Sequence, residues 1–238
     1  MKRMLAAAFL LAGIGAGSYA PAAAAGTECR GLQSCILVVG PWVQVPAGSE
    51  PTYFNLACPG RGQTVGGLDA DRARSAVDLT FLGELGGPVA PGTTTGREIV
   101  FVARATGGRA VTFRPRLGCI PAAGGGGRSR TSYRPTRTLS AHVAVPKAVA
   151  PKLVRRARVV RLRALERQTA SFACRPKERL LAASVAIAFR TKTAPDAARL
   201  ASIRASVTRS GRVATATVRG APLAGVRVEL QILVVCAR

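Results

Sequence analysis

Six cysteines are the residues of this chain with the clearest capacity for covalent chemistry: Cys29, Cys35, Cys58, Cys119, Cys174 and Cys236. An even number of cysteines predicts disulfides if the chain enters an oxidising compartment. A zinc site instead needs cysteine or histidine ligands two to four residues apart. The closest cysteines here are six residues apart, and His142 is the only histidine. We therefore expect disulfides, and neither a metal site nor a cofactor.

No constellation of catalytic residue types is visible. The serine-elbow and phosphate-loop spacings do not occur, and His142 stands alone in a glycine- and arginine-rich segment. Asp69, Asp71 and Asp78 could supply paired carboxylates for glycoside chemistry, and Trp42 could stack on a sugar. A solvated turn for the aspartates, and a core or sheet-edge position for the tryptophan, are the simpler interpretations. We expect a non-catalytic protein; the alternative is a carbohydrate-active enzyme or ligand-binding protein that uses these carboxylates and Trp42.

Positive charge is concentrated in the second half of the chain. The net charge is +24; residues 26–121 hold nine arginines against seven acids, whereas residues 122–238 hold 24 lysines and arginines against four acids. The densest basic cluster consists of Lys152, Arg155, Arg156, Arg158, Arg161, Arg163 and Arg167. Such asymmetry is typical of a surface that binds a polyanion. A basic face that serves only solubility is the alternative.

The polyanions to consider are anionic cell-wall polymers, acidic polysaccharides, anionic lipid and free nucleic acid. We do not expect sequence-specific nucleic-acid binding, because no groove-reading motif is visible. Base stacking would have to use Phe172, Phe189 and Tyr133, which are the aromatic residues of the second half.

The N-terminus has the layout of a secretory signal peptide. Lys2 and Arg3 precede an apolar run over residues 4–17, and small residues follow up to Ala25. The run is shorter than the roughly 20 residues that cross a bilayer, and no later segment is long enough. We expect cleavage after Ala25, a mature chain without a transmembrane segment, and a secreted or cell-envelope location.

The cysteine spacing indicates an internal repeat. Cys119 follows Cys58 by 61 residues, and Cys236 follows Cys174 by 62. This repeat predicts the disulfides Cys58–Cys119 and Cys174–Cys236, and it leaves Cys29 and Cys35 to pair locally. In the chain-entropy model, a loop of that length gains roughly 4 kcal/mol of stability from its bridge.

The neighbourhoods of the cysteines match as well. Seven to nine residues after the first cysteine of each pair lie Val65-Gly66-Gly67 and Leu181-Ala182-Ala183. A glycine–arginine dipeptide opens the apolar run into the last cysteine of each pair, at Gly96-Arg97 and Gly211-Arg212.

Hydropathy patterning predicts an all-β fold. Apolar residues alternate with polar ones from Val226 to Val234, which is the period-two pattern of a half-buried strand. Segments 97–106, 110–119, 180–189 and 211–219 are short, rich in β-branched residues and bounded by glycine or proline. Segments 155–167 and 196–205 also fit helices. We favour a strand for 155–167, because the repeat aligns it with residues 43–45, and leave 196–205 open.

Several strands in each copy predict two tandem β-sandwich modules, each closed by one disulfide. The first spans residues 26–121 and the second, basic module spans residues 152–238. Between them, residues 122–151 contain four consecutive glycines and several spaced prolines, which is the composition of an extended linker.

The first half is similar to a module of exported actinobacterial proteins that repeat a Cys-Pro, Gly-Gly and Cys pattern. The residues that carry this resemblance are Cys58, Pro59, Gly66, Gly67 and Cys119. The resemblance extends over residues 26–238, but the second half has Arg175 before its proline and alanines in place of the glycine pair. It implies a cell-envelope or extracellular location and a disulfide-linked β-fold, and it implies no activity.

Overall fold

The computed structural model describes residues 27–29, 35–48, 50–73, 76–82, 96–121, 153–163, 166–220 and 225–238. The predicted signal peptide and the predicted linker, with His142, lie outside the described residues, and so does Lys152. Within the described ranges, no helix is long and apolar enough to span a bilayer.

Antiparallel strands make up most of the described chain. The first half contributes η1 (Thr27–Cys29), β1 (Ile36–Val39), β2 (Trp42–Val45), β3 (Thr52–Ala57), β4 (Gln63–Arg72), β5 (Val77–Leu82), β6 (Glu98–Ala105) and β7 (Val111–Pro121). The second half contributes β8 (Leu153–Arg161), β9 (Arg167–Ala173), β10 (Arg179–Arg190), α1 (Ala197–Ser202), β11 (Arg204–Ser210), β12 (Val213–Arg219) and β13 (Arg227–Ala237). The predicted all-β class is thus correct. Segment 155–167 begins as a strand, and segment 196–205 holds α1 followed by the start of β11.

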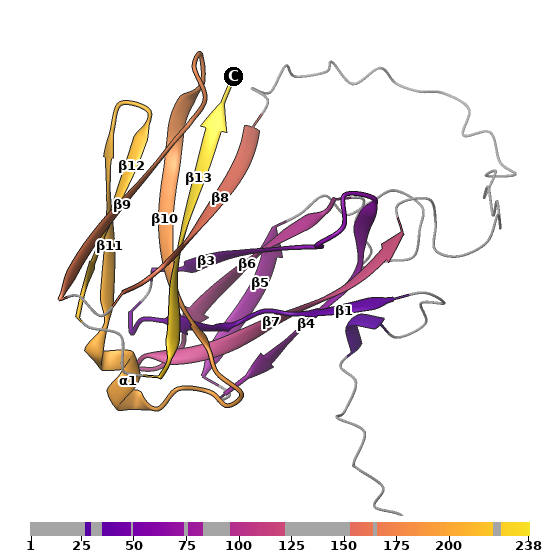
Figure 1. Cartoon of the computed structure of the whole chain (residues 1–238). Helices are drawn as coiled ribbons and strands as arrows, with labels where there is room; N and C mark the ends of the chain where they lie inside the picture. The colour runs from indigo at the N-terminus through magenta and orange to yellow at the C-terminus, as the bar shows by residue number, and fades with distance from the viewer. Residues whose placement is uncertain are drawn as a thin grey trace, which may run out of the picture.

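One seven-stranded sheet contains strands from both halves. Its order is β1-β7-β2-β10-β13-β8, and β4 also pairs with β7. The junction is the pairing of β2 with β10, where Val43 lies opposite Ala188 and Trp42 opposite Phe189. Two three-stranded sheets, β3-β6-β5 and β9-β12-β11, complete the fold. In Figure 1, β9, β12 and β11 lie to the left of β10 and β13.

The two halves pair their strands in the same way. β6 pairs with β3 and β5 in the first half, and β12 pairs with β9 and β11 in the second. The last strand of each half is likewise central: β7 pairs with β4 and with β1 and β2, while β13 pairs with β10 and β8.

The core consists of two hydrophobic clusters that largely follow the two halves. They exchange residues at the junction: Trp42 belongs to the second-half cluster, whereas Ala186 and Ala188 belong to the first-half cluster. Alternate residues of β10 therefore face different cores, and this central strand is covered on both faces. The junction is part of the interior.

Strand β13 is buried on both faces as well, which the alternation of its sequence did not predict. Glu229 and Gln231, which were expected to face solvent, are each 3% exposed, and so is Leu233 on the same face. Gln231 on this face contacts β3 of the first half. Its side-chain oxygen accepts from the backbone amide of Asn55 at 2.6 Å, and its side-chain nitrogen donates to the carbonyl oxygen of Asn55 at 2.8 Å. The first half therefore covers the face that a solitary sandwich would leave open.

The three disulfides are Cys29–Cys35, Cys58–Cys119 and Cys174–Cys236, the pairing that the cysteine spacing predicts. Three disulfides indicate an oxidising compartment. Backbone contacts around the two long-range bridges also correspond. The amide of Cys58 donates to Arg97 at 2.8 Å, and the amide of Cys174 donates to Arg212 at 3.0 Å.

The strand register corrects one detail of the sequence alignment. Val65 lies opposite Cys119, and Leu180, rather than Leu181, lies opposite Cys236. Each pairing is followed by a bulge, at Gly66 and at Leu181. The match is displaced by one residue because the turn after Cys174 is one residue shorter than the turn after Cys58.

The glycines of the first half make room for the N-terminal segment. Gly67 and Gly118 lie opposite each other on β4 and β7. A Cβ atom at either position would come within about 2.1 Å of the carbonyl oxygen of Glu28 in η1. Only glycine therefore allows this close approach. Ala182 and Val235 form the corresponding pair in the second half.

Candidate functional site

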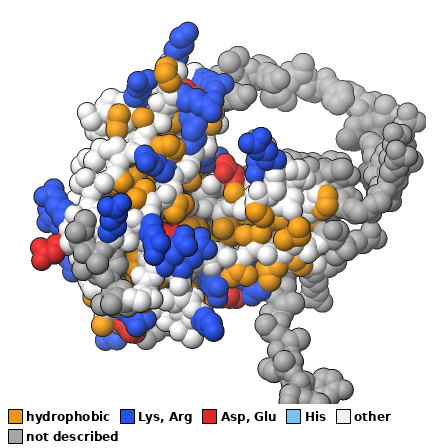
Figure 2. Space-filling view, viewed as in Figure 1, with side chains coloured by type: hydrophobic (Ala, Val, Ile, Leu, Met, Phe, Trp, Pro, Cys, Tyr) orange, Lys and Arg blue, Asp and Glu red, His pale blue; other side chains and the backbone are white. Residues whose placement is uncertain are grey.

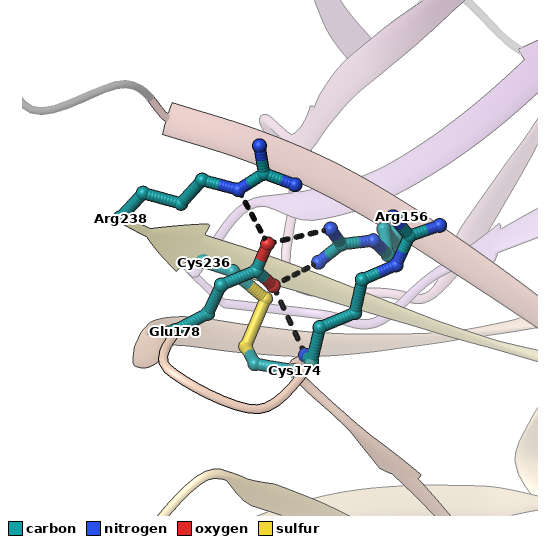
Figure 3. The surroundings of a disulfide bond; sticks show 6 residues. Arg156, Cys174, Glu178, Cys236 and Arg238 are labelled. Carbon is teal, nitrogen blue, oxygen red and sulfur yellow. Dashed lines mark hydrogen bonds and ion pairs between the residues drawn. A yellow bond between two sulfur atoms is a disulfide. The ribbon is translucent and has the colours of Figure 1, made fainter.

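A buried carboxylate, Glu178, lies beside the Cys174–Cys236 disulfide (Figure 3). The turn between β9 and β10 positions it. The amide of Glu178 donates to the carbonyl oxygen of Arg175 at 3.1 Å, and its side-chain Oε2 accepts from the amide of Arg175 at 3.0 Å. Because this turn begins directly after Cys174, the disulfide fixes the position of the carboxylate.

Two arginines engage Glu178. Arg156 on β8 donates from both terminal nitrogens, at 2.6 and 2.9 Å, and Arg238 donates from Nε at 3.0 Å. The hydrogen bond from Arg156 is the main cause that lowers the pKa of Glu178 to about 2. Burial opposes this shift, while Arg238 and the backbone amide of Arg175 add to it. The carboxylate is therefore ionised at neutral pH, and its bond in turn raises the pKa of Arg156.

Potential metal ligands meet at the same place. One ligand atom from each of Cys174, Glu178 and Cys236 lies within 4.8 Å of the others. Both sulfur atoms are bonded to each other, however, whereas the thiolate is the form of cysteine that binds metals. Both carboxylate oxygens of Glu178 also accept from arginine. We interpret the group as an ion-pair cluster that ties β8 and the C-terminal residue to the turn.

The described residues of the predicted basic cluster do not share one face of the sheet. Arg156 and Arg158 lie opposite Val234 and Ile232, which face the second-half core, so these two arginines share that face of the edge strand β8. Arg155 and Arg161 lie on the other face. Arg163 follows the strand.

Two arginines of the predicted basic cluster contact or belong to the β9-β12-β11 sheet, and a third is bound by an acid. Arg158 donates to the carbonyl oxygen of Ser171 on β9 at 2.8 Å, and Arg167 begins β9. Arg156 is held by Glu178 and is therefore less available to a ligand than the sequence suggested.

Most described arginines of the second half have no acidic partner, because three of its four acids are already paired. Glu178, Glu229 and Asp196 bind arginines, while Glu166 is exposed. Exposed arginines without an ion pair among the described residues are Arg155, Arg158, Arg161, Arg163, Arg167, Arg175, Arg179, Arg204, Arg209, Arg212 and Arg219. Figure 2 shows Lys and Arg side chains spread over the left part of one face, where β8 to β13 lie, and hydrophobic side chains in a band across its middle and right.

Three of these arginines form a row that sequence reasoning missed. Arg167, Arg219 and Arg204 lie directly opposite one another on β9, β12 and β11. They are far apart in the sequence, whereas the predicted cluster was grouped by closeness along the chain. Alternation of polar and apolar residues within 204–210 and 213–219 indicates which side chains face outward. The row itself becomes visible only when the pairing of these strands is known.

The candidate carboxylates are divided between two sheets. Asp69 and Asp71 lie on β4, and Asp78 lies on β5. Asp71 binds Arg116 at 3.1 Å, and Arg116 also binds the buried Glu28 at 3.0 Å. Burial lowers the pKa of Arg116, but the hydrogen bond to Asp71 and the surrounding acids raise it overall. Asp71 is thus part of a structural ion-pair cluster.

Trp42 is not available as a platform for sugars. The residue is 8% exposed and packs in the second-half core, and the Arg114 guanidinium lies 5.8 Å from its ring centroid. The structure therefore does not bring Trp42 and the aspartates into one cleft.

A hollow of about 420 Å³ lies where the halves meet. Gln44 of β2 lines it and donates from Nε2 to the carbonyl oxygen of Leu200 at 2.6 Å. The remaining walls are mostly aliphatic, with Arg204 as the charged residue of its described lining. Its composition is that of a packing junction.

Comparisons of this chain with protein-family models, with curated proteins and with solved structures found no match. The resemblance to exported actinobacterial proteins therefore stays a prediction.

Proposed function

We propose that this chain is a non-catalytic protein of the cell envelope or the extracellular space, and that its second half binds anionic polymers. One observation carries the proposal. The described second half exposes eleven arginines without an ion pair, while three of its four acids are engaged by other arginines. Such a surface carries a positive potential that attracts polyanions.

Three disulfides and the composition of residues 1–25 support an exported location. The equal pairing of strands in the two halves, with a disulfide at the same place in each, supports the interpretation of the chain as two copies of one β-module. On this interpretation, the first copy is nearly neutral, and the basic copy supplies the ligand-binding surface.

Purified bacterial cell walls test this function. The full exported chain should be retained by walls that carry anionic polymers and released by salt, because counterions compete for the same charges. Walls stripped of their anionic polymers, and neutral dextran beads, should retain little. Equal retention by stripped and intact walls would show that charge does not govern binding.

A further inference from the structure

The arginine row belongs to the outward face of the β9-β12-β11 sheet. On the inward face, Ala214, Ala216 and Val218 of β12 are buried in the second-half core. Side chains of a strand alternate between faces, so the intervening residues point away from the core. Arg167 and Arg204, directly opposite Arg219 on the two flanking strands, share this outward face.

Two rows of hydroxyl side chains lie beside the arginine row. The first row consists of Thr169, Thr217 and Ser206, and the second of Ser171, Thr215 and Thr208. Ser171 and Thr215 are joined by a hydrogen bond of 3.0 Å between their hydroxyl oxygens. Each hydroxyl can both donate and accept. The face therefore presents one cationic row and two rows that match a polyhydroxylated ligand.

Without a bound ligand, the row of Arg167, Arg219 and Arg204 destabilises the fold. Like charges directly opposite each other on neighbouring strands destabilise a sheet. Neighbouring strands are about 4.8 Å apart, so three guanidinium groups are anchored within about 10 Å. No acid among the described residues forms an ion pair with any of the three. An anionic ligand would relieve this repulsion.

We propose that this outward face binds a linear acidic polysaccharide, with sugar carboxylates on the row Arg167, Arg219 and Arg204 and sugar hydroxyls on the Ser/Thr rows. This inference rests on the proposed function and names its site. The planar guanidinium fork binds carboxylates through two parallel hydrogen bonds. The described rows of the face contain no aromatic side chain, so they give the bases of a nucleic acid no stacking platform.

Charge-matched variants of the full chain locate the site. Binding of polygalacturonate to the triple variant R167S/R204S/R219S should be weaker by roughly tenfold or more, because three charged hydrogen-bond donors are lost. The control R155S/R161S/R179S removes three arginines that are also exposed but lie outside this sheet. It should bind within about threefold of wild type, because long-range attraction is screened by salt. Equal weakening of both variants would overturn the assignment to this face.

A second set of variants tests the polysaccharide chemistry. T169V/T208V/T217V keeps the charge and the β-branched shape but removes hydroxyls. It should weaken polygalacturonate binding several-fold and leave binding of a single-stranded DNA oligonucleotide unchanged. An equal effect on both probes, or none on either, would overturn the role of the hydroxyl rows. If the wild-type protein binds neither polygalacturonate nor DNA, the proposed function itself is wrong. If it binds polygalacturonate and only the control variant R155S/R161S/R179S weakens binding, the proposed function stands and the assignment to this face is wrong.

Discussion

The two three-stranded sheets pair their strands identically but present different outward faces. On β3-β6-β5 this face holds Tyr53, Val100 and Leu82, and part of it packs against β13 of the second half. On β9-β12-β11 it holds arginines, serines and threonines. The strand pairing constrains the inward residues of both sheets, so the outward faces are free to differ. One sheet uses its outward face to join the halves, whereas the other leaves Arg167, Arg204 and Arg219 on its outward face exposed.

The turns that follow Cys58 and Cys174 show a parallel contrast. Gln63 accepts from the amide of Gly60 at 2.9 Å, as Glu178 accepts from the amide of Arg175. The first half thus closes its turn with a neutral amide, and the second half uses a carboxylate that also binds two arginines. In the second half, charged side chains therefore stabilise this turn and also lie on the surface.

Removal of a long-range disulfide should have the largest effect and tests whether the halves are equivalent. The chain-entropy model gives nearly equal values for loops closed over separations of 61 and 62 residues. C58A/C119A and C174A/C236A should therefore each lose about 4 kcal/mol of unfolding free energy. Urea unfolding of both double variants measures the losses. A much smaller loss for one pair would break the equivalence of the two halves.

Gln231→Ala should have the next largest effect, because it removes the hydrogen bonds that join β13 to the β3-β6-β5 sheet. Both backbone hydrogen bonds to Asn55 would be lost, and the buried backbone groups would stay unsatisfied. We expect a loss of about 2 kcal/mol in urea unfolding. Arg219→Ala on the free face is the matched control, with a change within about 0.5 kcal/mol. Similar losses for the two variants would contradict the contrast between the faces.

Glu178→Gln gives the second-half turn the side-chain type of the first and should have a smaller effect, since the amide can still accept from Arg175. The folded-state pKa of Glu178, about 2, lies below its ordinary value of 4.5. The carboxylate therefore stabilises the fold fully above pH 4.5 and loses this contribution as the pH falls towards 2. Wild type should exceed the variant in unfolding free energy at neutral pH, and the difference should shrink over that interval. A difference that does not change with pH would refute this role.

Features that depend on local spacing in the sequence, namely the disulfides and several strands, were predicted. The cysteine spacing predicted the disulfides, and β-branched runs predicted β6, β7, β10 and β12. Pairing between distant segments left no local signal, so the junction of β2 with β10 was not foreseen. The same reason hid the burial of Gln231, because its hydrogen-bond partner, Asn55, lies on β3.

The sequence shows that positive charge is concentrated in the second half, but it does not show how the arginines are arranged on the surface. The run from Arg155 to Arg167 contains residues on both faces of β8, and Arg156 is engaged by an acid 22 positions later. The row on the outer sheet arises from cross-strand register, which cannot be read from proximity along the chain.

The salt dependence of polygalacturonate binding by the full chain tests the central claim most directly. Each contact between an arginine and the polymer releases counterions, with a slope of about −0.9 per contact for a polymer as densely charged as duplex DNA. We predict a steep linear fall of the logarithm of affinity with the logarithm of salt concentration, and a shallower fall for R167S/R204S/R219S. A flat response of the wild-type protein would contradict the account and leave the arginines of the second half as a solubility feature.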